Sequence, residues 1–220
     1  MKFRLAILAL ASISAWTFSA EPVASKTEAK DTMVLFDGKS LNDWEKVDIG
    51  GSGEVSLEEG ELIIAQGESV SGAVYKKVKE LPLQNYEISL EAMRVEGADF
   101  FCGLTFPVGD LKTCLTLVLG GWGGAVTGIS SIDGMDASEN NTSSFQRFAD
   151  NTWYKVRLQV TPKELHVWID GKEVVNTDIE GKKLGVRPGP IESYLPLSLT
   201  TFQTRAAYKN IKLTKIAPTK

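Results

Sequence analysis

Hydrophobic and polar residues alternate along much of this chain, and a period of two predicts β-strands. The clearest case is the segment 86–95, where Tyr86, Ile88 and Leu90 alternate with polar residues such as Glu87. A strand of this kind has one apolar face for a core and one polar face for solvent. Helical periodicity is weak throughout, so the pattern favours an all-β protein.

Two more alternating segments, 154–161 and 164–170, are joined by a short turn around Pro162. The dipeptide Asp170-Gly171 predicts a second hairpin leading into 173–177. Frequent turn residues between short strands are typical of a two-sheet antiparallel sandwich rather than of βαβ units. The other strands that we expect are 54–57, 61–65, 72–76, 100–106, 112–119, 126–131, 197–202 and 207–215.

The first twenty residues have the pattern of a secretory signal peptide. Lys2 and Arg4 precede an apolar run over 5–13, and small residues follow near Ala20. An uncleaved anchor helix is the alternative, although the run is shorter than the ~20 residues that span a membrane. We therefore expect a signal peptide over 1–20, a flexible lead-in over 21–32 and a single domain over 33–216. That organisation predicts a periplasmic or secreted protein with no stable membrane span after signal removal.

The composition and net charge of the chain limit the kinds of partner that we expect it to bind. The chain has 220 residues, 43% of them hydrophobic, which suits one domain with a real core. It carries 24 Lys and Arg against 28 Asp and Glu, for a formal net charge of -4. A basic footprint for nucleic acid is missing. We expect a monomer that does not bind nucleic acid.

The two cysteines raise the question of a disulfide. An exported chain with an even number of cysteines favours a bridge. Folding the predicted hairpin about Val108 would place Cys102 opposite Cys114, within bridging reach. Two buried free thiols are the alternative. With two cysteines and one histidine we predict no protein metal centre.

Five segments resemble one known family. The opening LFDGKSLNDW (35–44) is the most specific, and four later segments follow in the same order. The chain resembles the 3-keto-disaccharide hydrolase domain family from about 33 to 216. The resemblance implies a concanavalin-A-like jelly-roll fold and activity on 3-keto-glycosides, by hydrolysis or by elimination followed by hydration. The resemblance does not imply a specific cofactor, although a divalent metal would suit the chemistry. The later segments are NYEISLEAMRV (85–95), FCGLTFPV (101–108), WYKVRLQVTPKELHVWIDGKEVV (153–175) and AYKNIKL (207–213).

That chemistry requires a base and an enolate stabiliser, because a ketone at C3 acidifies the hydrogen at C2. Glu91 matches a glutamate of the family, so Glu91 or His166 is the predicted base, with Arg157 stabilising the enolate. Glu87, Ser89 and Glu91 share one strand face, but the two Glu Cα atoms would lie ~13 Å apart. Retaining glycosidases place their carboxyl groups ~5–5.5 Å apart. A solvated acidic face is the alternative.

A polar and aromatic patch is predicted on the 154–170 hairpin. Folding it about Pro162 puts Gln159 opposite His166 and Arg157 opposite Trp168, so that the guanidinium can stack on the indole. Such a patch suits a sugar ring, and Glu87, Gln159 and Trp168 are predicted substrate contacts. The alternative is that these residues cover a convex face.

Two tryptophans and two aspartates outside these hairpins are further candidates for a functional role. Trp122 stands in the glycine bend Gly120–Gly124 and is predicted to contact substrate. Trp44 is more consistent with a core anchor than with a ligand contact. Asp133 and Asp136 are either cation ligands or ordinary turn acids.

Three classes of function stay open from the sequence. The first is an enzyme acting on 3-keto-glycosides, and the second is a lectin-like module that binds a saccharide without turnover. Several positions within Phe101-Cys102 and Leu115–Val118 are apolar where the family has polar residues, which favours the second class. A structural or cell-surface interaction domain is the third.

Overall fold

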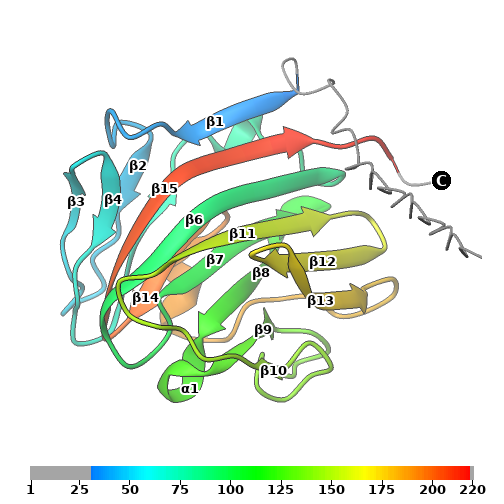
Figure 1. The fold of residues 1–220 in the computed structure, drawn as a ribbon. Coiled ribbons are helices and arrows are strands. Elements are labelled where there is room, and N and C mark those ends of the chain that lie inside the picture. The colour runs from blue at the N-terminus through cyan, green and yellow to red at the C-terminus, as the bar shows by residue number, and fades with distance from the viewer. Residues whose placement is uncertain (1–30, 219–220) are drawn as a thin grey trace, which may run out of the picture.

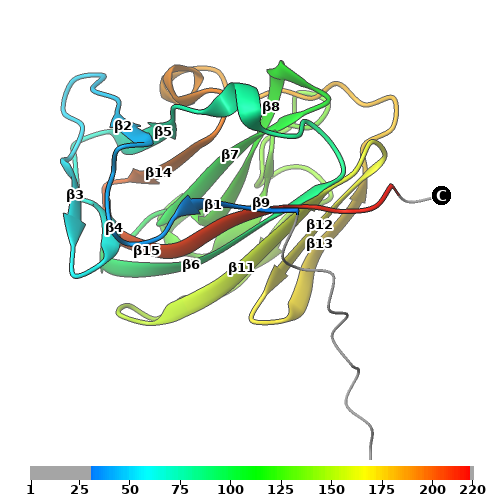
Figure 2. The ribbon, with the colours of Figure 1, turned by 90° about the horizontal axis from the view of Figure 1, so that it is seen from above.

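The computed structural model describes residues 31–218, and its strands form two antiparallel sheets that pack face to face (Figures 1 and 2). The all-β sandwich predicted from the alternation is therefore confirmed. The predicted signal peptide and most of the lead-in lie outside the described residues. The first strand begins at Thr32, within the segment that was predicted to be flexible.

Sheet A contains eight strands. In spatial order they are β13 (Lys172–Asp178), β12 (Glu164–Ile169), β11 (Trp153–Val160), β6 (Tyr86–Gly97), β15 (Thr204–Lys215), β4 (Glu61–Ile64) and β3 (Val55–Glu58), and β1 (Thr32–Phe36) also pairs with β15. The register of β11 with β12 places Arg157 opposite Trp168 and Gln159 opposite His166. The hairpin pairing predicted from the turn at Pro162 is thus confirmed.

Sheet B contains seven strands. In spatial order they are β10 (Ser144–Phe145), β9 (Val126–Ser130), β8 (Asp110–Gly120), β7 (Cys102–Val108), β14 (Ser198–Phe202), β5 (Val70–Tyr75) and β2 (Trp44–Lys46). Three short helical turns complete the fold: η1 (Val78–Glu80), α1 (Gly121–Gly124) and η2 (Pro190–Tyr194). No helix among residues 31–218 is long and apolar enough to cross a membrane.

The core lies between the inner faces of the two sheets. Two tyrosines of sheet A, both fully buried, reach across it to backbone carbonyls of sheet B. Tyr86 donates from its hydroxyl to Pro107 O at 2.5 Å, and Tyr208 donates to Phe101 O at 2.6 Å. Each buried hydroxyl is therefore satisfied, which removes the cost of burying it. Trp44 is 5% exposed and donates to Leu35 O at 2.9 Å, as expected of a core anchor.

The predicted disulfide is wrong. Cys102 pairs with Leu119 rather than with Cys114, and both cysteines are buried free thiols. The Asp110 carboxylate accepts hydrogen bonds from the backbone amides of Lys112 and Thr113, each at 2.7 Å. The chain reverses at Gly109, where Val108 pairs with Asp110, and a bulge over 111–113 then places Cys114 opposite Pro107. At about 3.3 Å per residue, the new register separates Cys114 from the residue facing Cys102 by roughly 16 Å along β8.

A long connection between β13 and β14, which we call the strap (residues 179–197), crosses the outer face of sheet B. At one end Gly185 exchanges backbone hydrogen bonds with Ser131, just after β9. At the other end Tyr194 donates to Val70 O at 3.1 Å, and Tyr75 N donates to Leu197 O at 2.9 Å. The strap is thus attached near β9 at one end and at β5 at the other, and it forms one wall of a pocket over the outer face of sheet B.

Candidate functional site

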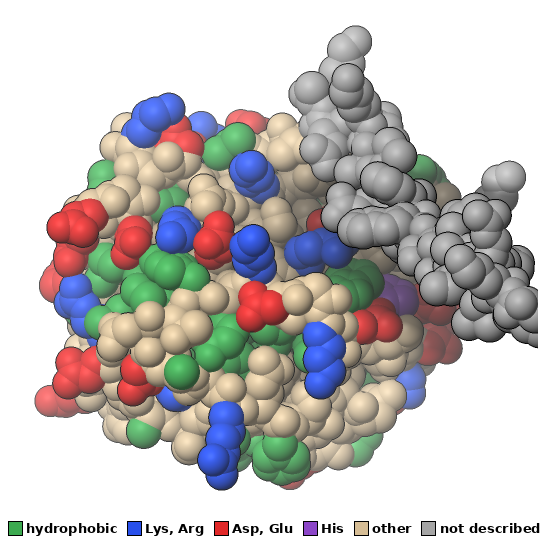
Figure 3. Space-filling model, viewed as in Figure 1, with side chains coloured by type: hydrophobic (Ala, Val, Ile, Leu, Met, Phe, Trp, Pro, Cys, Tyr) green, Lys and Arg blue, Asp and Glu red, His purple; other side chains and the backbone are tan. Residues whose placement is uncertain are grey.

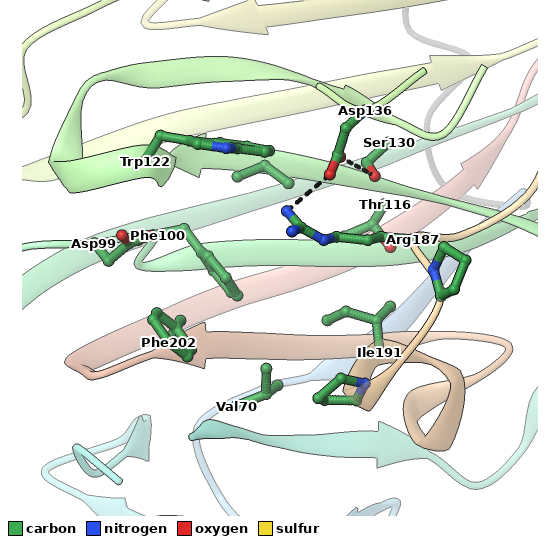
Figure 4. Close-up of a pocket in the computed structure, with 13 residues that line it drawn as sticks. Val70, Asp99, Phe100, Thr116, Trp122, Ser130, Asp136, Arg187, Ile191 and Phe202 are labelled. Atoms are coloured by element: carbon green, nitrogen blue, oxygen red, sulfur yellow. Dashed lines mark hydrogen bonds and ion pairs between the residues drawn. The ribbon is translucent and has the colours of Figure 1, made fainter. Parts of the chain in front are cut away.

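A pocket of about 400 Å³ lies between the strap and the outer face of sheet B. We call it the apolar pocket, because most of its wall is aromatic or aliphatic (Figure 4). The volume is within the range of small-molecule sites. Its lining consists of Val70, Asp99, Phe100, Thr116, Val118, Trp122, Ser130, Asp136, Arg187, Pro188, Pro190, Ile191 and Phe202.

Beside the apolar pocket, one row across sheet B contains three glycines together with the lining residue Val118. Gly128, Val118, Gly103, Thr200 and Gly72 are successive partners in one row of five strands. A Cβ on Gly103 would lie 2.3 Å from the Thr200 hydroxyl and 3.0 Å from the Phe100 ring. Glycine is therefore required for that ring to lie against the sheet.

The α1 bend presents Trp122 at the rim of the pocket. Trp122 has a φ of 51° and is 42% exposed, and the glycines around it allow so tight a turn. Asp99 connects this bend to the strand below. Its carboxylate accepts from Gly123 N at 3.0 Å and from Phe100 N at 2.7 Å. The two aromatic side chains are thereby positioned by one acid.

Asp136 is the main acidic group in the wall. Its Oδ1 accepts from the Ser130 hydroxyl at 2.5 Å and from Ala137 N at 2.8 Å. Its Oδ2 pairs with Arg187 Nη1 at 2.8 Å, and the side chain is only 16% exposed. These charge-assisted contacts fix the direction of the carboxylate.

Arg187 extends from the strap across the mouth of the pocket. Its guanidinium lies over the Trp122 ring, 5.8 Å from the centroid, while it pairs with Asp136 (Figure 4). The side chain is 60% exposed, so its other donors face solvent or a ligand. Three segments far apart in sequence, the bend, the loop after β9 and the strap, thus meet at one cation.

A second cavity adjoins the first. It has about 230 Å³, and we call it the polar hollow because hydroxyl, carboxylate and guanidinium groups line it. Trp122, Asp136, Arg187 and Pro188 line both cavities. The Asp136–Arg187 pair therefore stands at the boundary between an apolar and a polar compartment. The other residues of the polar hollow are Ser131, Gly134, Ser138 and Glu139.

Most of the site residues predicted from sequence lie elsewhere, on the outer face of sheet A. Arg157 lies over Trp168 at 4.6 Å and makes a two-point contact with Glu87, at 2.7 and 3.0 Å. The hydrogen bonds with Glu87 raise the pKa of Arg157. His166 stacks against Trp168 at 5.6 Å. Figure 3 shows this side of the molecule, with basic and acidic side chains interspersed.

Glu91 is not part of that cluster. It accepts from Asn210 at 2.7 Å on β15, whereas His166 Nδ1 contacts Glu173 at 2.8 Å on β13. Glu91 and His166 are two strand spacings and four residue positions apart, which corresponds to roughly 16 Å. The structure thus brings Arg157, Glu87, Trp168 and His166 together beside Gln159, and leaves Glu91 apart. Their roles in substrate binding and catalysis stay predictions.

No three His, Cys, Asp or Glu side chains within residues 31–218 converge as metal ligands. Asp133 accepts from Lys183 N at 2.8 Å, and this hydrogen bond lowers the pKa of Asp133. The carboxylate oxygens of Asp136 are already engaged by Ser130, Ala137 and Arg187. The described acids therefore do not form a divalent metal site.

Trp122, which the sequence predicted as a substrate contact, lines both cavities, whereas the sequence marked Asp136 only as a loop acid. The sequence-based prediction missed Arg187, Ser130 and the aromatic wall. An arginine in the Pro- and Gly-rich segment 185–190 was the available signal, since loops held by a rigid scaffold often carry function. Phe100 and Phe202 gave no signal, because they read as ordinary strand residues.

Two antiparallel sheets with a walled pocket on one outer face define the class as a jelly-roll β-sandwich domain. The chain belongs to the family of 3-keto-alpha-glucoside-1,2-lyase-like domains, whose model matches residues 31–214. The resemblance seen in the sequence motifs is confirmed. None of the curated proteins matches the sequence of this chain.

Solved structures share the fold at low sequence identity. A "putative glycosyl hydrolase" from Parabacteroides distasonis is 16% identical with a TM-score of 0.55, covering 89% of this chain and 99% of its own. The Crh5 transglycosylase in complex with NAG is 11% identical with a TM-score of 0.59, covering 86% of each chain. A Bacillus subtilis protein with a galectin-like fold is 11% identical with a TM-score of 0.53, covering 88% of this chain and 99% of its own.

Proposed function

We propose that this chain is an exported domain that binds a 3-keto-glycoside over sheet B and cleaves its glycosidic bond. Family membership supports the substrate class, and the signal-peptide pattern of residues 1–20 supports a periplasmic or secreted location. The observation that carries the proposal is the Asp136–Arg187 pair beside Trp122, at the junction of the two cavities.

Each of these residues has a part in the proposed reaction. Trp122 offers an indole face on which the C–H face of a sugar ring can pack. Asp136 is a hydrogen-bonded carboxylate of low exposure, and such a group can serve as a general base. Arg187 carries donors that can receive negative charge on a ketone oxygen.

The cleavage is an elimination followed by hydration. Asp136 takes the proton from C2, and the C2–H electrons form an enolate whose oxygen accepts hydrogen bonds from Arg187. The enolate collapses, the C1–O bond breaks, and the leaving oxygen takes the proton that Asp136 removed and becomes a free alcohol, which regenerates the carboxylate. Water then adds to the C1=C2 bond of the enone and restores the 3-keto sugar. No redox partner is needed.

Purified protein with 3-keto-trehalose tests the activity. We expect release of glucose, measured by a coupled glucose assay, with a transient enone absorbance in the ultraviolet. Asp136→Asn should abolish release while keeping the shape of the side chain. Release that is unchanged in Asp136→Asn would exclude Asp136 as the base.

Glycan binding without turnover is the second candidate, and one observation favours it. Both carboxylate oxygens of Asp136 already have protein partners in the structure, so a base would first have to give one of them up. Saturable calorimetric binding of trehalose with no product from its 3-keto form would select this alternative.

A further inference from the structure

The two cavities differ in chemistry, although they share the Asp136–Arg187 boundary. On one side, Ser131, Ser138 and Glu139 offer hydrogen-bonding groups to a ligand. On the other side, the part of the apolar pocket away from Asp136 is built from Phe100, Phe202, Val70, Ile191 and Pro190. In Figure 4, Phe100, Phe202, Val70 and Ile191 lie on the side of the pocket opposite Asp136 and Ser130.

The residues on the apolar side pack against one another and form a wall. The rings of Phe100 and Phe202 stack with centroids 6.2 Å apart and planes inclined by 21°. Phe202 pairs with Val70 in the neighbouring strand, and Phe202 N donates to Phe100 O at 3.1 Å. The strap contributes Ile191 and Pro190 to the same wall. The side chains of these five residues offer a ligand no hydrogen-bonding group.

From this division we propose that the natural substrate is a glycoside with an apolar aglycone, aromatic or alicyclic, and not a disaccharide. The sugar ring occupies the polar hollow, the scissile bond lies at Asp136 and Arg187, and the aglycone fills the apolar pocket. This inference rests on the proposed function for the placement of the sugar, and it adds the identity of the leaving group.

A second sugar in the apolar pocket would be disfavoured for a physical reason. Its hydroxyl groups would leave water and find no side-chain partners among the five apolar residues, and an unsatisfied buried hydroxyl is costly. A phenyl ring loses no hydrogen bonds there and gains from leaving water. Stacking on Phe202 or Phe100 adds to that gain.

The test compares two substrates that share the 3-keto-glucose ring and differ only at C1. Phenyl 3-keto-α-glucoside and 3-keto-trehalose are assayed for release of phenol and glucose. We expect KM to be lower for the phenyl compound by at least about tenfold, as an apolar group of this size is worth in a fitting pocket. The KM values are compared because phenol is also a better leaving group than glucose and would raise kcat by itself. Equal KM values, or a lower KM for the disaccharide, would overturn the proposal.

Failure of turnover does not leave the inference untested. If neither compound is cleaved, calorimetry with phenyl α-glucoside and with trehalose measures the same preference as a ratio of Kd values. Tighter binding of the phenyl compound, again by about tenfold, supports an apolar aglycone site in a protein that is not an enzyme. Binding that favours trehalose, equal binding or no binding of either compound would reject it.

Variants locate the preference. Phe202→Ser on β14 and Ile191→Asn on the strap each place a polar group in the apolar wall, and each should lower the preference for the phenyl compound, as a ratio of KM or Kd values, at least about fivefold. Phe145→Ser is the matched control, because Phe145 is 81% exposed on β10 and does not line the pocket. A ratio that stays unchanged in both pocket variants, while their thermal melting stays cooperative, contradicts the placement.

Discussion

The Asp136 carboxylate and the Arg187 guanidinium lie 2.8 Å apart, although 51 positions separate them in the chain. The loop after β9 carries one and the strap carries the other. The backbone hydrogen bonds between Ser131 and Gly185 hold these two segments side by side. The pair is therefore a product of the strap's path over sheet B, and the function proposed here depends on it.

Replacing the base should affect chemistry more than binding. Asp136→Asn keeps the hydrogen bonds to Ser130 and Ala137 within reach but cannot accept a proton, so we expect kcat to fall by about 10²–10⁴-fold. KM should change much less. Steady-state release of glucose from 3-keto-trehalose measures both. Asp133→Asn, on the same loop but outside both cavities, is the control that should keep the wild-type rate.

Removing the aromatic platform should weaken saccharide binding. Trp122→Ala deletes an indole that is shared by both cavities, and we expect about a tenfold rise in Kd or KM. Trp168→Ala is the comparison variant, because it removes a tryptophan from sheet A instead. Calorimetry on both variants measures the effect, and a larger loss in Trp168→Ala would move the binding site to sheet A.

The residues predicted on sheet A can be tested directly. If the pocket over sheet B carries the chemistry, Glu91→Gln and His166→Ala should keep kcat/KM within about twofold, as for surface changes away from a site. Arg157→Gln should behave alike, because its guanidinium is bound to Glu87. Loss of turnover in Glu91→Gln or His166→Ala, with melting temperatures unchanged, would restore the base to sheet A.

The free thiols predict a loss of stability at high pH. Burial raises the pKa of Cys102 from 9.0 to about 12, because the thiolate is penalised in the core. Above pH 9 the unfolded chain releases this proton before the folded chain does, so the free energy of unfolding falls as pH rises from 9 to 12. Burial raises the pKa of Tyr86 and Tyr208 as well, with the same sign.

Urea unfolding at pH 7 to 11 measures this effect. The midpoint should be flat up to about pH 9 and then fall, and the fall should be smaller in Cys102→Ala. A thiol titration adds a second readout: Cys102 should be unreactive in the native protein and both cysteines reactive after unfolding, without reductant. A bridge that must be reduced first would contradict the free thiols.

The alternation of side chains determined much of this protein by itself. It predicted the sandwich and most of its strands, because a strand with one buried face must alternate. It also placed Arg157 against Trp168, since that pair depends only on a short turn and a local register. The family motifs, most of which lie in the same predicted strands, added the protein family.

Tertiary structure decided the rest. The disulfide prediction failed because a bulge beside Asp110 shifts the register of β8 against β7, and such a shift re-pairs every residue beyond it. The candidate site lies on sheet B because a long connection returns over that face, and no local pattern specifies the path of such a connection. Contacts such as Arg187 with Asp136 and Trp122 join segments that only the packed fold brings together.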